Sequence, residues 1–458
     1  MSFPKYPAYK DSGVEWLGEV PEHWEVIEAR REIDFLTSGS RGWAEYYSDE
    51  GPLFLRIGNL TRDSVHLDLS DLQRVSPPAD SEGSRTRVQP GDVLFSITAY
   101  LGSVAVVPDG LEEAYVSQHV CLARLSARKL MPDWMAYSVL SASGKAYLEA
   151  ESYGGTKVQL SLDDIKSFPL TMPPIKEQKQ TVYFLDHETS KIDALIAEQQ
   201  RLIELLQEKR QAVISHAVTK GLNPDAPMKD SGVEWLGEVP EHWLLKPTRR
   251  LIRTIEQGWS PQCENYSVDG SEGWGVLKVG CVNGGVFRST ENKSLPVELD
   301  PKPELAILKD DLLVSRANTR ELVGSAAVAG QDYPNLLLCD KLYRLRVDRK
   351  EARPQFLSYF LGSREARSQI ELEASGASNS MLNISQSVIL ELSCPAPPAD
   401  EQQIIVEAIN RQLNHLVNLV TEAAKAIKLL QERRSALISA AVTGQIDVRV
   451  LVPETVAA

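Results

Sequence analysis

The chain has 458 residues, 43% hydrophobic and 24% charged, with a formal net charge of −14. This composition is typical of a globular protein of roughly two to four domains, and the negative charge argues against a simple polycationic DNA binder. No apolar run approaches the ~20 residues of a membrane span, and the N-terminus has no signal pattern, so we expect a cytoplasmic protein without membrane contacts. The five cysteines form no CxxC pair, which favours reduced thiols and no metal site.

One segment of the sequence occurs twice without change. Residues 10–24 read KDSGVEWLGEVPEHW, and residues 229–243 read the same. The match continues at lower identity between 54–60 (FLRIGNL) and 276–282 (VLKVGCV), 91–96 (GDVLFS) and 310–315 (DDLLVS), 119–125 (HVCLARL) and 341–347 (KLYRLRV), and 205–219 (LLQEKRQAVISHAVT) and 429–443 (LLQERRSALISAAVT). The chain is therefore one unit of about 220 residues present in two copies, a period too long for a solenoid repeat.

The first part of each copy combines several secondary-structure patterns. Short β-rich runs, such as residues 92–97 and 312–315, alternate with Gly, Pro and Asp turns, and the apolar residues follow no single helical period. This pattern predicts two α+β globular domains, at residues 1–172 and 222–396.

The second part of each copy is helical. Pro-Pro joints at 173–174 and 397–398 precede stretches at 173–221 and 397–446, and a short tail follows at 447–458. Apolar residues recur at spacings of three, four and seven, which predicts amphipathic helices of about 40 residues and on the order of 60 Å. We expect the two helices to pair as an antiparallel coiled coil. The predicted contacts are Leu185, Ile192, Leu195, Leu202 and Leu206 of the first helix with Leu416, Leu419, Ile427 and Leu430 of the second. The alternatives are that each helix packs on its own domain or forms a dimer interface.

The order of these features resembles the specificity subunit of type I restriction-modification systems. The resemblance is carried by the entry motif at 10–24 and 229–243, the Pro-Pro joints and the LLQE[KR]R helix ends, and it covers nearly the whole chain. It implies two target-recognition domains with helical spacers and no catalytic activity. It also implies that the subunit binds double-stranded DNA and two methyltransferase subunits, with restriction subunits joining through that core. By the same resemblance this chain binds no cofactor: S-adenosylmethionine belongs to the methyltransferase, which methylates adenine N6, and ATP and Mg to the restriction subunit.

Internal two-fold symmetry presents two equivalent readers to one duplex, and half-sites about one helical turn apart lie on the same side of the DNA. The helices then fix the gap between the half-sites. Because the two domains differ in sequence, the target is expected to be asymmetric and bipartite.

DNA contacts are expected in the divergent, polar segments with glycine turns, because the identical entry motif cannot read two different half-sites. The entry motif, with Trp16, Trp24, Trp235 and Trp243, is expected to be scaffold or a docking surface for two copies of a partner. The candidate DNA-binding residues are Arg41, Trp43, Arg85, Arg87, Thr156 and Lys157 in the first copy and Trp259, Arg316, Asn318, Arg320, Ser378 and Asn379 in the second. Arginine is the usual partner of guanine and asparagine that of adenine, while hydroxyls and lysine suit phosphate.

Two other functions remain open from the sequence: a freestanding tandem DNA-binding regulator and a protein-binding adaptor. Residues 25–172 carry more acidic than basic side chains, and residues 244–396 carry equal numbers. Any phosphate-binding face must therefore be a local patch, and the chain alone should bind non-specific DNA weakly. The sequence has neither a GxxxxGK[ST] motif nor a DPPY-type motif, so no catalytic function is predicted.

Overall fold

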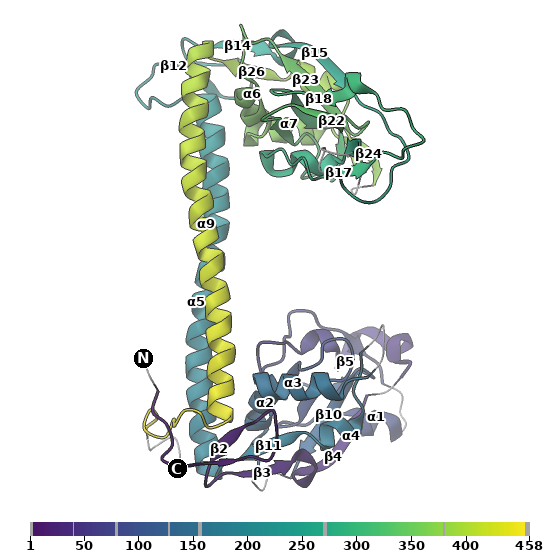
Figure 1. Cartoon of the computed structure of the whole chain (residues 1–458), viewed down its shortest axis with the longest axis vertical. Helices are drawn as coiled ribbons and strands as arrows, with labels where there is room; N and C mark the ends of the chain where they lie inside the picture. Colours follow the sequence, from purple (N-terminus) through teal and green to yellow (C-terminus); the bar gives the residue numbers. More distant parts are fainter. Residues whose placement is uncertain are drawn as a thin grey trace. The chain divides into compact units, whose positions relative to one another are not determined.

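The computed structural model describes residues 3–39, 41–77, 81–126, 129–153, 158–268, 273–378 and 381–453. The chain divides into two compact units, residues 1–200 with 425–458 and residues 201–424. Each unit holds one globular domain and a part of each of two long helices (Figure 1). Within the described ranges, no helix combines the length and apolar character that crossing a membrane requires.

The first globular domain is built on a four-stranded antiparallel sheet of order β4-β10-β7-β8, with a three-stranded sheet β6-β5-β9 beside it. Every side chain of β7 is buried, so this strand is central rather than half-exposed. The elements of this domain are β1 (Tyr9–Asp11), β2 (Glu19–Pro21), β3 (Glu25–Glu28), β4 (Ile33–Ser38), β5 (Tyr47–Leu55), β6 (Arg74–Val75), α1 (Ser81–Thr86), β7 (Val93–Ser96), β8 (Val104–Val106), β9 (Ala114–Val116), β10 (Val120–Leu125), α2 (Pro132–Leu140), α3 (Ala142–Glu151), α4 (Leu162–Lys166) and β11 (Pro169–Met172).

The second globular domain repeats this plan with a four-stranded antiparallel sheet of order β15-β23-β19-β21. A mixed sheet, β17-β16-β22-β18, lies where the first domain has β6-β5-β9. Its elements are β12 (Met228–Asp230), β13 (Glu238–Pro240), β14 (Leu244–Pro247), β15 (Ile252–Gln257), β16 (Gly275–Leu277), β17 (Asn292–Ser294), β18 (Ala306–Ile307), β19 (Leu312–Ser315), β20 (Ala317–Asn318), β21 (Ala326–Val328), β22 (Tyr333–Leu337), β23 (Leu342–Val347), α6 (Pro354–Leu361), α7 (Arg364–Glu373), β24 (Ser375–Ser378), β25 (Met381–Asn383), α8 (Gln386–Glu391) and β26 (Ser393–Ala396). The predicted α+β fold with two pseudo-symmetric domains is confirmed.

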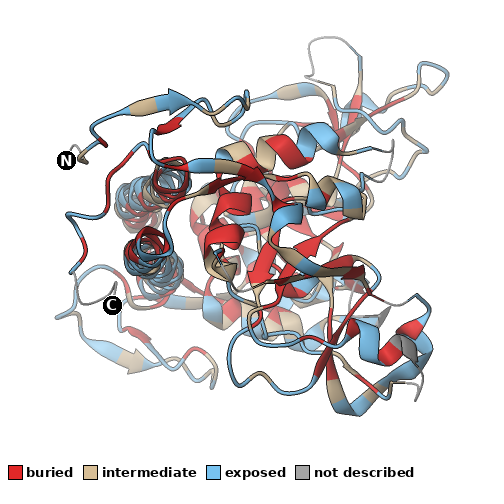
Figure 2. Ribbon diagram, turned by 90° about the horizontal axis from the view of Figure 1, so that it is seen from below, coloured by how far each residue is buried: buried red, intermediate tan, exposed pale blue. Residues whose placement is uncertain are grey.

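The long helices are α5 (Ile175–Lys220) and α9 (Ala399–Val442). In the first unit the N-terminal part of α5 packs with the C-terminal part of α9, and in the second unit the remaining parts pack together, so the pairing is antiparallel in both. Figure 2 shows both helices with a buried and an exposed face. The predicted antiparallel coiled coil is confirmed. Each helix also packs on its own domain: Leu185 and Ile192 of α5 share a core with Trp134, and Ile405 of α9 shares one with Phe356.

The contact seam of the helix pair is narrower than predicted. The less exposed positions alternate at spacings of three and four, as in a heptad: 192, 196, 199, 203, 206 and 210 in α5, and 409, 413, 416, 420, 423, 427, 430, 434 and 437 in α9. Leu206 and Leu416 are buried in this seam, whereas Ile427 and Leu430 are half-buried. The prediction was wrong for Leu195, Leu202 and Leu419, which are 51%, 40% and 38% exposed. They flank the seam, because a two-stranded coil covers a narrower stripe than a globular core does.

Each long helix is attached to its domain by a buried glutamine in its first turn. The amide of Gln178 accepts a hydrogen bond from the N–H of Met131 (2.9 Å) and donates to the carbonyls of Lys129 (2.7 Å) and Pro173 (2.9 Å). Gln402 makes the same three bonds in the second unit. The Pro-Pro joint is therefore a fixed connection, and each domain is held in a defined orientation to its own helix.

Candidate nucleic-acid interface

A small three-stranded sheet, which we call the platform, lies at the end of the buried strand β19. It consists of β20, β25 and β24 in that order, with Ala317 paired to Asn383 and Ser375 also paired to Asn383. The chain leaves the core directly after Ser315, which is fully buried, and enters the platform at once. The platform thus brings the candidate DNA-binding residues Asn318 and Ser378, which lie about 60 residues apart in the sequence, into one small sheet.

Trp259 and Arg316 meet next to the platform at the backbone of Asp340. The Trp259 carbonyl accepts from the Asp340 N–H (3.2 Å), and Arg316 Nη1 donates to the Asp340 carbonyl (3.3 Å). Lys302 Nζ lies 4.6 Å from the centre of the half-buried indole ring of Trp259, a cation–π distance. An arginine, a lysine and an indole brought together from three separate segments can contact both phosphates and base edges.

The other residues predicted in the second copy lie on or beside the platform. Asn318 ends β20, where its Oδ1 accepts from the Thr319 N–H (2.9 Å) and its Nδ2 donates to Asn283 Oδ1 (3.3 Å). The side chain of Arg320 is exposed. Ser378 ends β24, and Asn379 lies outside the described residues.

The first unit has an equivalent platform made of single β-bridges. Gln159 bridges both Thr98 and Tyr153, as Asn383 pairs with Ala317 and Ser375 in the second unit. Thr98 Oγ1 lies 3.0 Å from Nδ1 of His119, and Gln118 Nε2 lies 3.0 Å from Nε2 of the same ring. The counterpart of residues 316–320 is therefore 97–101, a segment that contains none of the candidate residues of the first copy. Extending the match of GDVLFS with DDLLVS by five residues would have found it.

The residues predicted in the first copy are more scattered. Arg41 is exposed, Arg85 Nη1 donates to Thr37 Oγ1 (2.8 Å), and Arg87 forms an ion pair with Glu113 (3.4 Å). The prediction for Trp43 was wrong. Its side chain is 3% exposed and stacks on Phe54 at 5.8 Å, because it fills the small core behind β5. Thr156 and Lys157 lie outside the described residues.

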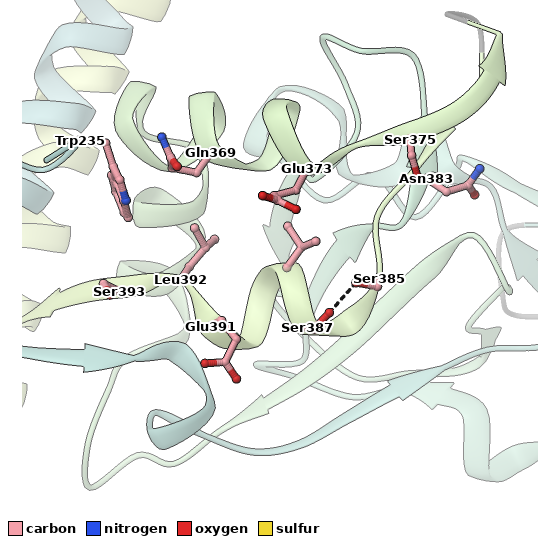
Figure 3. A pocket seen from close by; sticks show the side chains of 11 residues that line it. Trp235, Gln369, Glu373, Ser375, Asn383, Ser385, Ser387, Glu391, Leu392 and Ser393 are labelled. Carbon is pink, nitrogen blue, oxygen red and sulfur yellow. Dashed lines mark hydrogen bonds between the residues drawn. The ribbon is translucent and has the colours of Figure 1, made fainter. Parts of the chain in front are cut away.

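A cavity of about 440 Å³ separates the second platform from the entry motif (Figure 3). Trp235 forms one wall, Ser375 and Asn383 of the platform form the other, and α7 and α8 contribute Glu373 and Glu391. Helix α3 of the first unit carries Tyr147 at the position that Gln369 has in α7. The Tyr147 ring packs edge to face on Phe168, with ring centres 5.4 Å apart. The cavity at Trp16 has only about 10 Å³. The two copies of the entry motif therefore border differently shaped surfaces.

The entry motif also supplies the core at the start of each long helix. Trp24 and Trp243 are fully buried. Glu177 accepts a hydrogen bond from Tyr6 (2.6 Å) and pairs with His23 (2.9 Å), and Glu401 pairs with His242 (2.9 Å) in the second unit. Burial and the bond to Glu177 raise the pKa of Tyr6 far above its ordinary value. Within the described ranges, His, Cys, Asp and Glu side chains form no group that could hold a metal ion.

Comparisons with known proteins agree with this architecture. Residues 81–206 match the family described as the type I restriction modification DNA specificity domain. The chain is 23% identical to the type I restriction enzyme EcoKI specificity subunit of Escherichia coli K12, over 94% of this chain and 90% of that one. It is 22% identical to the StySPI specificity subunit of Salmonella potsdam, over 94% and 90% of the two chains.

Two solved structures have a similar fold. One is a chain from a structure of complex assembly and conformational transition in the type I R-M system. It has a TM-score of 0.68 at 17% identity, over 92% of this chain and 98% of that one. The HsdS subunit from Thermoanaerobacter tengcongensis has a TM-score of 0.50 at 16% identity, over 93% and 98%. At these identities the likeness shows the fold.

Proposed function

We propose that this chain, which belongs to the family of type I restriction-modification specificity subunits, selects a DNA target written in two parts with an unread gap between them. One observation carries the proposal. The two units share their sheet order and an identical entry motif, yet they carry different side chains on equivalent platforms. A shared fold that carries different polar side chains is what two domains need in order to recognise two different half-sites.

Each platform would read one half-site. In the second unit, Arg320 and Asn318 offer the donors and acceptors that suit guanine and adenine in the major groove. In the first unit the positions equivalent to Asn318 and Thr319 hold Ala99 and Tyr100, with His119 and Gln118 beside them. Because these sets differ, the two half-sites differ in sequence, and the target is asymmetric.

The helix pair would set the gap and dock two methyltransferase subunits. Its support is the set of exposed leucines that flank the seam, Leu195 and Leu429 in the first unit and Leu205 and Leu419 in the second. The two pairs are equivalent positions of the repeat. Exposed apolar residues in equivalent places suit two copies of one partner. The chain itself would be non-catalytic, with S-adenosylmethionine on the methyltransferase subunits and ATP and Mg on restriction subunits that join them.

Co-expression of the chain with its candidate methyltransferase tests this function. We expect a stable complex that methylates adenines in one bipartite, asymmetric sequence, which mapping of methylated adenines in genomic DNA would display. Tight, sequence-specific binding by the chain alone, without a stable complex, would favour the freestanding regulator. A stable complex that neither binds nor methylates DNA would favour the protein-binding adaptor.

Replacing Arg320 by alanine should relax recognition at one half-site only, by about 1–3 kcal/mol per lost base contact. The side chain is exposed on the second platform, so its removal leaves the core intact. The measurement is the methylation rate on duplexes that vary one half-site at a time. Tyr100→Ala on the first platform is the matched variant and should relax the other half-site. Loss of discrimination at both halves in either variant would contradict the assignment of one domain to one half-site.

A further inference from the structure

Three cationic side chains line one cavity where the first globular domain meets its part of the helix pair. The cavity has about 230 Å³, and its cations are Arg62 from the loop after β5, Lys145 from α3 and Arg434 from α9. Asp63 and Asp193 line the same cavity. This excess of positive charge stands out in a domain whose acidic side chains outnumber its basic ones.

The three cations are held close together. Lys145 Nζ donates to the backbone carbonyl of Arg62 (3.1 Å), and Arg434 is paired with Asp193 (2.8 Å). Burial lowers the pKa of Lys145, and the charges of Arg62 and Arg434 lower it further, against the opposing effect of Asp63. The Arg62 guanidinium also lies 5.2 Å from the ring centre of Tyr100 on the platform loop. The cation cluster is therefore next to the surface proposed to read DNA.

The second unit has a cavity of about 190 Å³ at the equivalent place. Arg367 is the fourth residue of α7, as Lys145 is the fourth residue of α3. Arg210 occupies in α5 the position that Arg434 occupies in α9, as the match of 205–219 with 429–443 shows. Both positive charges are thus present in both copies, one from the domain and one from the helix.

The ion pair of the first unit does not explain this repetition. The position of Asp193 is taken in the second unit by Val417, which is exposed. Arg210 instead donates to the carbonyl of Gly284 (3.0 Å). The carboxylate partner of the helix arginine has been replaced while that arginine is retained, and Arg367 is paired within its own helix with Glu371 (2.9 Å). The internal partners therefore differ between the two units, and what both cavities share is one cation from the domain and one from the helix.

We propose that Arg62, Lys145 and Arg434 form a clamp for a phosphodiester group of the DNA backbone, and that Arg210 and Arg367 form its counterpart in the second unit. The proposal rests on the function proposed above. Every half-site has the same backbone, whatever its bases, so phosphate-binding charges should be common to both copies while the platforms differ. Clamps beside the two platforms fix where each platform lies on the duplex.

The clamp is tested with Lys145→Gln in the full chain co-purified with its methyltransferase. Binding is measured by fluorescence anisotropy at several salt concentrations, on a duplex that carries the mapped target and on one that lacks it. Because one phosphate contact is lost, the slope of log affinity against log salt should fall by about 0.9, and affinity should fall about fivefold at ~0.15 M salt. Both duplexes should lose affinity by the same factor. Lys145→Arg should retain the slope.

Lys166→Gln is the matched control, because it removes an exposed lysine of the same domain that lies at the end of α4 and away from the cavity. Arg62→Gln is a second variant on an exposed side chain, in case the Lys145 variant does not fold. An unchanged salt slope in the cavity variants overturns the clamp, as does a loss confined to the target duplex. Weaker co-purification of the methyltransferase with an unchanged salt slope also overturns the clamp. It would mean that the cations pair with a carboxylate of the methyltransferase. Failure of the unmodified complex to bind its target would instead refute the proposed function.

Discussion

Replacing Arg344 by alanine should lower the free energy of unfolding of the second unit by about 3–5 kcal/mol. The side chain is 1% exposed and lies on β23. Its Nη1 donates to the carbonyl of Ala306 (2.7 Å), and its Nη2 donates to that of Glu304 (3.0 Å) and pairs with Glu256 (2.6 Å). The alanine variant leaves these acceptors unpaired beside the buried Asp311 and opens a cavity. Urea denaturation and hydrogen exchange of the β23 amides measure the loss.

The first unit supplies the matched control for this prediction. There Leu122 stands opposite Thr37 on neighbouring strands, where the second unit has Arg344 opposite Glu256. The double variant Arg344→Leu with Glu256→Thr copies the arrangement of the first unit, so it should recover most of the stability that Arg344→Ala loses. Arg344→Leu alone should fall between the two, because Glu256 loses its nearer partner and keeps only Arg346 at 3.9 Å. A double variant no more stable than Arg344→Ala would show that the ion pair is not the source of the stability.

Much of the fold could be predicted because the chain contains its own comparison. The identical entry motif at 10–24 and 229–243 fixes the register of the two copies, and the Pro-Pro joints and glycines mark where the helices begin and end. The α+β domains and the antiparallel helix pair followed from alternation, turns and periodicity. All of these are local patterns or patterns of repetition, and a single sequence displays both.

The candidate site could be predicted only in part, because it depends on contacts between distant segments. Polar composition does not distinguish Trp43, which fills a core, from Trp259, which is half-buried next to the platform. The role of Gln159 depends on bridges to Thr98 and Tyr153, and no local pattern indicates them. The cation cluster was missed for the same reason, since Arg62, Lys145 and Arg434 come from three separate elements.

The same limit applies to the helix pair, where the apolar period indicated the correct face of each helix but not the width of the seam.

Replacing Leu416 by aspartate should lower the free energy of unfolding by about 4 kcal/mol or more, because the side chain is 5% exposed and a carboxylate there would be buried without a partner. Leu419→Asp, three residues further along α9, should cost less than about 1 kcal/mol, because its side chain is 38% exposed. Thermal unfolding of the two variants measures the difference.

The two leucine variants also separate stability from assembly. If the exposed leucines dock the methyltransferase, Leu419→Asp should leave the chain folded but reduce co-purification of the partner, whereas Leu416→Asp should impair both. Unaltered co-purification in the Leu419 variant would move the docking surface away from this face of α9. Equal destabilisation by both variants would contradict the narrow seam, because an aspartate buried between the helices should cost far more than an exposed one.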